Sequence, residues 1–142
     1  MTNVDPNNEG TFRTCIISSD YRQTHIAKNA VVKELNRHGF HEKAVFAVKL
    51  ALEEALVNAV KHGNECDPSK KIIVRYAVNS VKAVIVIRDE GAGFEPDQIP
   101  DPTTPERLPI PSGRGIMLIR AYMDEVQFRD NGRELYLVKN RR

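Results

Sequence analysis

Several features that mark large protein classes are absent or scarce in this sequence. Its 142 residues include no tryptophan, 6% aromatic residues and two cysteines, Cys15 and Cys66, which form no Cys-x-x-Cys or Cys/His cluster. Two isolated cysteines argue against structural zinc and against a disulfide-stapled secreted fold. No apolar run approaches the roughly 18 residues of a membrane-spanning helix. Residues 1–10 are polar and match neither a signal peptide nor a transit peptide.

Charge of either sign is not in excess. The formal net charge is +2, with 28% charged and 41% apolar residues, which is the balance of an ordinary soluble globular domain. No Lys/Arg stripe with interleaved aromatic residues is present, so nucleic-acid binding is not predicted. We expect a cytoplasmic protein with no membrane contact, made of a flexible leader over residues 1–10 and a single domain over residues 11–142.

The first half of the chain predicts a strand and two helices. Residues 11–19 are rich in β-forming side chains. A helix is expected from a cap at Ser19 or Asp20 to a stop at Gly39. A longer helix is predicted over about residues 41–62. The residues expected on the apolar faces are Ile26, Ala30, Val31 and Leu35 in the first helix, and Val45, Val48, Leu52, Ala55, Leu56 and Ala59 in the second.

The second half predicts four strands, a third helix and a long loop. Alternating apolar residues indicate strands over residues 71–78 and 81–88, and a closing hairpin over residues 126–139 has Asp-Asn-Gly at its turn. Residues 95–112 hold six of the eight prolines, and loops this long are usually functional lids or disorder. The third helix is predicted to open at Gly113.

This order of elements predicts the fold class. It lacks the βαβ alternation of a Rossmann fold, and most neighbouring strands are joined by hairpins. We therefore predict an α+β, two-layer sandwich of three helices on a mixed, mostly antiparallel sheet of about five strands, with a proline-rich lid.

The second helix carries the most informative pair in the chain. Glu54 and Asn58 are one helical turn apart, which places a carboxylate and a carboxamide on one face. A carboxylate can take a proton, and a carboxamide oxygen can bind Mg²⁺ whose other ligands are phosphates. Ala47 and Ala51 continue this face, and we interpret these small side chains as room for a ligand.

Two glycine-bearing segments turn this pair into a nucleotide-site hypothesis. Asp89 ends a predicted central strand and can accept the exocyclic amino group of adenine, while Gly91 and Gly93 let the backbone approach a flat ligand closely and adopt positive φ. Gly113 and Gly115 precede the third helix, whose N-terminal N–H groups and dipole suit a phosphate. Taken singly, a plain turn and a flexible hinge explain these segments as well. No Walker A loop or protein-kinase glycine loop with its partner motifs is present.

Together and in this order, the three segments resemble the N, G1 and G2 boxes of the GHKL ATPase superfamily, which shares the Bergerat ATP-binding fold. Within it the chain resembles the bacterial anti-sigma factor serine/threonine-protein kinases. The similarity extends over about residues 11–139. The matching segments are Glu54-Ala55-Leu56-Val57-Asn58-Ala59 with His62-Gly63, Arg88-Asp89-Glu90-Gly91-Ala92-Gly93-Phe94, Gly113-Arg114-Gly115-Ile116 and Tyr122-Met123-Asp124-Glu125-Val126.

The resemblance implies a role for each motif. Glu54 would be the base that activates a hydroxyl nucleophile, and Asn58 would bind the Mg²⁺ that bridges the ATP phosphates. His62 shares their helix face and would contact the phosphates or metal, or cap the helix. The implied adenine pocket consists of Asp89, Gly91 and Gly93, and the implied phosphate cradle of Gly113, Arg114, Gly115 and Ile116, under a lid over residues 95–112.

The resemblance also implies a function, with ATP and Mg²⁺ as cofactors. The protein would be an ATP-dependent serine/threonine-protein kinase and anti-sigma factor. It would sequester a sigma factor and phosphorylate a small antagonist protein on Ser or Thr. Phosphorylation would release the antagonist and leave the kinase free to hold the sigma factor, in a partner-switching cycle. Such proteins are commonly homodimers.

Two other functions stay open. Many superfamily members carry a Thr in the final strand that helps to bind adenine, whereas residues 132–136 contain neither Thr nor Ser. The alternative is therefore a GHKL module that regulates a partner by binding alone, although the presence of both Glu54 and Asn58 argues against it. A histidine-kinase catalytic domain ranks last. The 40 residues before the Glu54 helix are too few for a dimerising hairpin as well as the first strand and helix.

Overall fold

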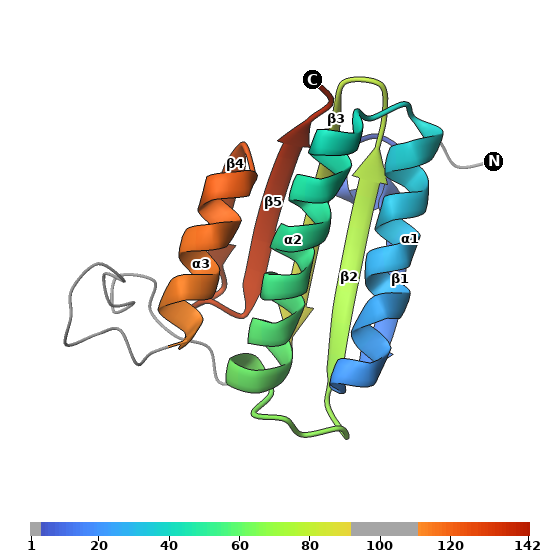
Figure 1. Ribbon diagram of the computed structural model, residues 1–142. Coiled ribbons are helices and arrows are strands. Elements are labelled where there is room, and N and C mark those ends of the chain that lie inside the picture. The colour runs from blue at the N-terminus through green and yellow to red at the C-terminus, as the bar shows by residue number, and fades with distance from the viewer. Residues whose placement is uncertain (1–3, 92–110) are drawn as a thin grey trace.

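Three helices cover one face of a five-stranded sheet (Figure 1). This computed structural model describes residues 4–91 and 111–142, with side chains over residues 4–91 and 115–142. Every pair of neighbouring strands is antiparallel, so the predicted α+β sandwich is confirmed. In pairing order the strands are β1 (Arg13–Ser18), β2 (Lys71–Val78), β3 (Lys82–Asp89), β5 (Glu134–Asn140) and β4 (Glu125–Arg129).

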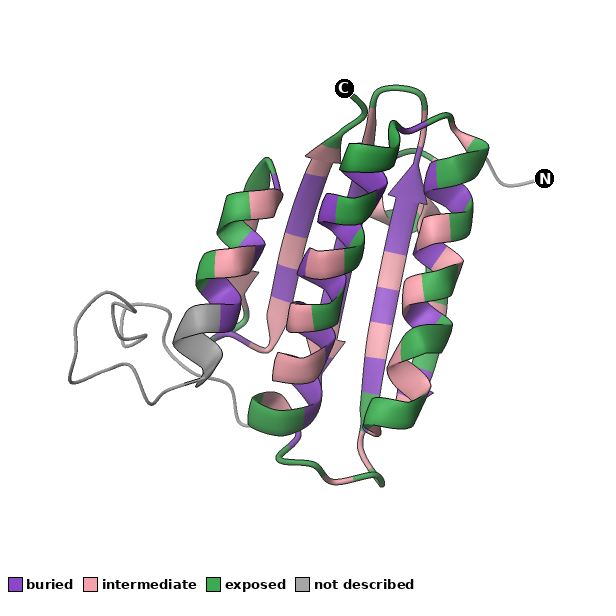
Figure 2. Cartoon of the chain, viewed as in Figure 1, coloured by how far each residue is buried: buried purple, intermediate pink, exposed green. Residues whose placement is uncertain are grey.

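The helical layer consists of α1, α2 and α3, and Figure 2 shows their buried stripes turned toward the sheet. Among the residues that the structure describes, no helix is both long and apolar enough to span a bilayer. The helices are α1 (Thr24–Arg37), α2 (Glu42–Asn58) and α3 (Pro111–Tyr122), and the shorter turns are η1 (Glu9–Thr11), η2 (Tyr21–Gln23) and η3 (Ala59–Gly63).

Helix α1 ends as predicted but begins only at Thr24, without a side-chain cap of its own, and one residue of its predicted apolar stripe is exposed. Asp20 caps η2, just before α1, by accepting the N–H of Arg22 at 2.8 Å, and Gly39 adopts φ +75° just after α1. Ala27 is 1% exposed, whereas Ile26 is 47% exposed. A shift of one residue rotates a side chain by roughly 100° around a helix, so Ile26 faces solvent and Ala27 takes its place in the core.

Helix α2 is the central element of the core and ends in a wider turn. All six residues predicted on its apolar face are buried in the main hydrophobic cluster. At its C-terminus the chain continues as η3, a π-helical turn in which the N–H of Asn64 donates to the carbonyl of Ala59 at 2.8 Å. Such turns are frequent at functional sites. Here the turn brings Gly63 and Asn64 against the end of β3.

Helix α3 packs along the alanine face of α2. Gly115, near the start of α3, lies beside Asn58 at the end of α2. The ring of Tyr122, at the end of α3, lies edge-on to the ring of Phe46 near the start of α2, with the ring centroids 6.5 Å apart. The two helices are therefore antiparallel, as Figure 1 shows. Ala47 and Ala51 are 6% and 0% exposed. Our interpretation of these alanines as room for a ligand is wrong, because small side chains here let a second helix approach closely.

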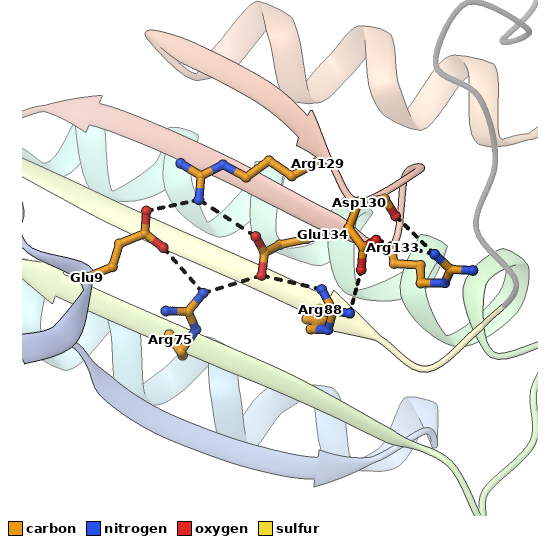
Figure 3. A network of polar contacts seen from close by, with 7 residues as sticks. All are labelled: Glu9, Arg75, Arg88, Arg129, Asp130, Arg133 and Glu134. Atoms are coloured by element: carbon orange, nitrogen blue, oxygen red, sulfur yellow. Dashed lines mark hydrogen bonds and ion pairs between the residues drawn. The ribbon is translucent and has the colours of Figure 1, made fainter.

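The N-terminal residues lie across the face of the sheet that the helices leave open. Glu9 bridges two strands: its carboxylate accepts from Arg75 on β2 at 3.3 Å and from Arg129 on β4 at 2.9 Å (Figure 3). Val84 and Val86 also belong to this face and are nonetheless 0% exposed. The sequence predicts only a flexible leader here. The partners of Glu9 are 66 and 120 residues away in the chain, so no local pattern announces them.

A second acidic residue, Glu134, is the centre of the same ionic network. Its carboxylate lies 3.3 Å from Arg75, 3.7 Å from Arg88 and 3.6 Å from Arg129, and its side chain is 13% exposed (Figure 3). We expect Glu134→Gln to lower the free energy of unfolding by about 1–2 kcal/mol, because three half-buried guanidinium groups lose a shared counter-charge. Glu9→Gln should cost less than about 1 kcal/mol. Chemical denaturation measures both values, and equal losses would contradict this ranking.

Candidate functional site

Elements α2, η3, β3, α3 and the closing hairpin meet around one pocket. It encloses about 470 Å³ of empty space, its open mouth included. Three polar side chains converge on otherwise apolar walls, which is the usual composition of a small-molecule site. The lining residues are Ala55, Asn58, Ala59, His62, Gly63, Ile87, Asp89, Ile116, Ile119, Phe128, Gly132 and Leu135.

Asp89 is the buried carboxylate of this pocket. It is 9% exposed, and its Oδ1 accepts the N–H of Gly91 at 2.8 Å. Burial raises the pKa of Asp89, and the Gly91 hydrogen bond and nearby cationic side chains only partly oppose this rise. An ionised carboxylate offers about four acceptor positions. Asp89 can therefore hold its own turn and still accept the amino group of a base.

Close approach explains the two glycines beside Asp89. A Cβ on Gly91 would lie 1.8 Å from the carbonyl oxygen of Gly63, and a Cβ on Gly63 would lie 2.3 Å from Oδ2 of Asp89. Neither glycine has a positive φ; among the described glycines that conformation occurs at Gly39 and Gly132. The positive φ predicted for Gly91 is therefore wrong. The close contact found there is with the backbone of Gly63, and the predicted approach to a flat ligand stays a prediction.

Two residues absent from the predicted site hold the turn that follows β3. Asn64 is 0% exposed; its Oδ1 accepts the N–H of Glu90 at 2.8 Å, and its Nδ2 donates to the carbonyl of Lys71 at 3.0 Å. Arg133 donates from Nε to the carbonyl of Gly91 at 2.9 Å. In the sequence Asn64 follows a glycine that marks the end of a helix. Arg133 lies in the final-strand region where many members of the GHKL superfamily carry a Thr. Neither context signals these contacts.

Glu54, Asn58 and Gly115 meet beside the pocket, of which Asn58 is a lining residue. A Cβ built on Gly115 would lie 3.0 Å from Nδ2 of Asn58 and 3.2 Å from Oε2 of Glu54. The structure thus brings together the first and third motifs of the sequence, which are more than 50 residues apart in the chain. Gly115 therefore packs closely against both polar side chains.

Helix α3 begins at Pro111, two residues earlier than predicted. Proline is favoured at the first position of a helix because its missing N–H has no intrahelical partner to lose. The N–H groups without intrahelical partners belong to the first turn, which includes Gly113 and excludes Gly115. Gly115 therefore contributes its small size rather than an open N–H.

The other predicted site residues divide into two groups. Ile116 is a buried wall residue, and His62 lies exposed at the rim. The partial burial of its imidazole and then the charge of Lys61 lower the pKa of His62, so its neutral form predominates at pH 7. Outside the described parts of the chain lie Gly93, the side chain of Arg114, the surroundings of Gly113, and the predicted lid up to residue 110.

Asp89→Asn should leave the stability of the ligand-free protein unchanged or raise it. Folding raises the pKa of Asp89, so this group favours the folded state at low pH and loses that contribution as pH rises through the raised pKa. Asparagine keeps the acceptor for Gly91 and carries no charge. The melting temperature of the variant without ligand should therefore equal or exceed that of wild type at pH 7, with the difference growing from pH 3 to pH 7. A lower melting temperature at pH 7 would contradict this.

The sequence matches the family model described as histidine kinase-like ATPase domain over residues 17–139. The chain belongs to this family. The matched range includes every residue that lines the pocket of this ATPase domain. The family is one of ATPase domains, which implies ATP binding, and residues from all three motifs of the resemblance line the pocket, among them Asn58, Asp89 and Ile116.

Individual relatives of this ATPase domain have related names. A serine-protein kinase RsbW from Oceanobacillus iheyensis is 32% identical over 98 residues, which are 65% of this chain and 62% of that protein. An anti-sigma F factor from Clostridium perfringens is 29% identical over 97 residues, 65% of this chain and 69% of that protein. The Bacillus subtilis RsbW is 28% identical over 102 residues, 68% of this chain and 64% of that protein. The matches therefore span about two thirds of these relatives.

Proposed function

We propose that this ATPase domain is an ATP-dependent serine/threonine-protein kinase and anti-sigma factor. It would bind and sequester a sigma factor, and it would phosphorylate a small antagonist protein on Ser or Thr to release it. The names of its relatives, serine-protein kinase and anti-sigma F factor, support both activities. The proposal includes a homodimer that works in the cytoplasm, where transcription takes place in bacteria.

One observation carries the kinase part of the proposal. Glu54 and Asn58 lie one turn apart on α2, and both are within 3.3 Å of the Cβ position of Gly115. A proton acceptor and a carboxamide oxygen thus face the same point, at the start of the helix implied to hold the phosphates. Nucleotide binding alone needs Asn58 but has no use for Glu54.

The donor set fits a Mg²⁺–ATP complex. Among the described residues no group of three His, Cys, Asp or Glu side chains could hold a metal alone. Asn58 would supply one oxygen ligand, and phosphates and water would supply the others, as is usual for Mg²⁺. When bound, the ion neutralises charge on the phosphates. Adenine would lie against Asp89 and the apolar walls of the pocket.

In the proposed transfer, this chain positions the reactants and takes up one proton. The Ser or Thr oxygen of the antagonist forms a bond to the γ-phosphorus while the bond from that phosphorus to the ADP oxygen breaks. ADP leaves with the electron pair of that bond. Glu54 accepts the hydroxyl proton, a role that contributes typically 10²–10⁴-fold to the rate.

The second candidate is a module that regulates its partner by binding alone. One observation favours it: the final-strand region offers Gly132 and Arg133 to the site, and no hydroxyl group. In this case the protein would bind ATP and its partner, and Glu54 would have no chemical role.

Incubation with γ-labelled ATP, Mg²⁺ and candidate antagonist proteins tests the proposal. The kinase proposal expects label on an antagonist Ser or Thr with wild-type protein and none with Asn58→Ala. ATP binding by wild type without transfer to any antagonist would favour the binding module. Failure of wild type to bind ATP would overturn both.

A further inference from the structure

The turn Asp89-Glu90-Gly91 carries the carboxylate of the pocket, yet it leaves the regular sheet at Asp89. An irregular turn does not by itself hold a side chain in one orientation. Two other segments of the chain hold this one, from opposite sides.

Asn64 holds the first side. It is fully buried, and both ends of its carboxamide are used, one on the N–H of Glu90 and one on the carbonyl of Lys71. The end of η3, the start of β2 and the end of β3 are thereby joined. This contact fixes the backbone directly after Asp89.

Arg133 holds the second side at two points. Its backbone carbonyl accepts the N–H of Asp89 at 3.0 Å, and its side-chain Nε donates to the carbonyl of Gly91 at 2.9 Å. The same guanidinium lies 3.4 Å from Asp130 (Figure 3), which supports it from the hairpin turn. Arg133 therefore spans the whole turn, from its first residue to its last.

The orientation of Gly91 decides the orientation of Asp89. The N–H of Gly91 binds Oδ1 of Asp89, and the carbonyl of the same residue is held by Arg133. These groups belong to two adjacent peptide units that meet at the Cα of Gly91, so the contact with Arg133 restricts rotation at Gly91 and helps to keep its N–H against the carboxylate. The other oxygen, Oδ2, lies against Gly63 at the pocket wall. A rotation at Gly91 would move the N–H that holds Asp89, the only acidic residue that lines the described pocket.

We propose that Arg133 is a positioning residue of the nucleotide site. It holds the Gly91 peptide so that Asp89 accepts the exocyclic amino group of adenine, and it thereby sets the preference for a 6-amino purine over a 6-oxo purine. This inference rests on the proposed nucleotide site. It assigns to Arg133 a share in the base recognition to which a final-strand Thr contributes in many members of the GHKL superfamily.

Two substitutions at the same position isolate the hydrogen bond to Gly91. Arg133→Met keeps the length of the chain but places a methyl group where Nε was. Arg133→Gln places an amide N–H at that point and can restore the bond. Both variants lack the guanidinium group and so lose its contact with Asp130 equally. A difference in affinity between them therefore reports on the hydrogen-bond donor opposite the Gly91 carbonyl.

Calorimetric titration with ADP and with inosine diphosphate supplies the readout, since these ligands differ in the amino group. We expect Arg133→Met to weaken ADP binding about tenfold and to leave inosine diphosphate binding unchanged. Arg133→Gln should recover most of the ADP affinity. Equal weakening for both ligands, equal behaviour of both variants, or an unchanged preference in Arg133→Met would overturn the inference and leave the proposed function standing. Wild type that binds no ADP would overturn both.

Discussion

Glu54→Gln is expected to stop phosphoryl transfer while ATP stays bound. Glutamine keeps the size of the side chain and its place beside Asn58 and Gly115, but it cannot accept a proton. Loss of a general base typically lowers the rate by about 10²–10⁴-fold. Single-turnover transfer of label from γ-labelled ATP to the antagonist measures the rate, and calorimetry measures ATP binding, which should change less than about threefold.

A matched control is available in the preceding residue. Glu53 is exposed and does not line the pocket, so Glu53→Gln should transfer label at the wild-type rate. If Glu54→Gln keeps more than a tenth of the wild-type rate, Glu54 is not the base. If it loses ATP binding together with transfer, its role is in binding.

Gly91→Ala is expected to close the base pocket. The new Cβ would lie 1.8 Å from the carbonyl oxygen of Gly63. A Cβ is fixed rigidly to its own backbone and the carbonyl belongs to the backbone of Gly63, so either the turn after β3 or the end of η3 must move. Overpacking of this kind costs about 1–3 kcal/mol, which lowers the melting temperature by roughly 3–10 °C in a domain of this size. Because the two displaced segments form the pocket wall, ATP affinity should fall by at least about 100-fold.

Gly10→Ala provides the comparison for this variant. The Cβ there would lie 3.2 Å from Oδ1 of Asn8, the end of a side chain that can shift, and the position is far from the pocket. We expect no change in ATP affinity and a melting temperature within about 2 °C of wild type. Wild-type ATP binding by Gly91→Ala would show that the two segments do not meet as described.

The parts of the molecule governed by local pattern could be predicted from the sequence. The apolar spacing of α2 predicted its buried face, and turn chemistry predicted the closing hairpin. The Glu54/Asn58 spacing needs only the geometry of one helix, so this pair could be placed without any tertiary information. The two-layer arrangement followed from the order of the elements.

The contacts between distant segments could not be predicted in this way. Asn64 reaches Glu90 across 26 residues, and Arg133 reaches Gly91 across 42. Such pairings depend on the strand order and on the π-helical end of α2, and neither feature leaves a periodic trace in the sequence. The small residues Ala47 and Ala51 had two physical explanations, an approaching helix or a ligand, and only the packing of α3 decides between them.

The sheet order also determines how far the segment between β3 and α3 can change in length. Strands β3 and β5 are hydrogen-bonded neighbours, yet paired residues such as Arg88 and Glu134 are 46 positions apart, and the proline-rich residues 95–112 fall within that interval. The entropy of closing a loop grows only with the logarithm of its length, so about ten added residues would cost only about 0.2 kcal/mol. Added or removed residues between the end of β3 and the start of α3 should therefore change the stability of the sheet very little.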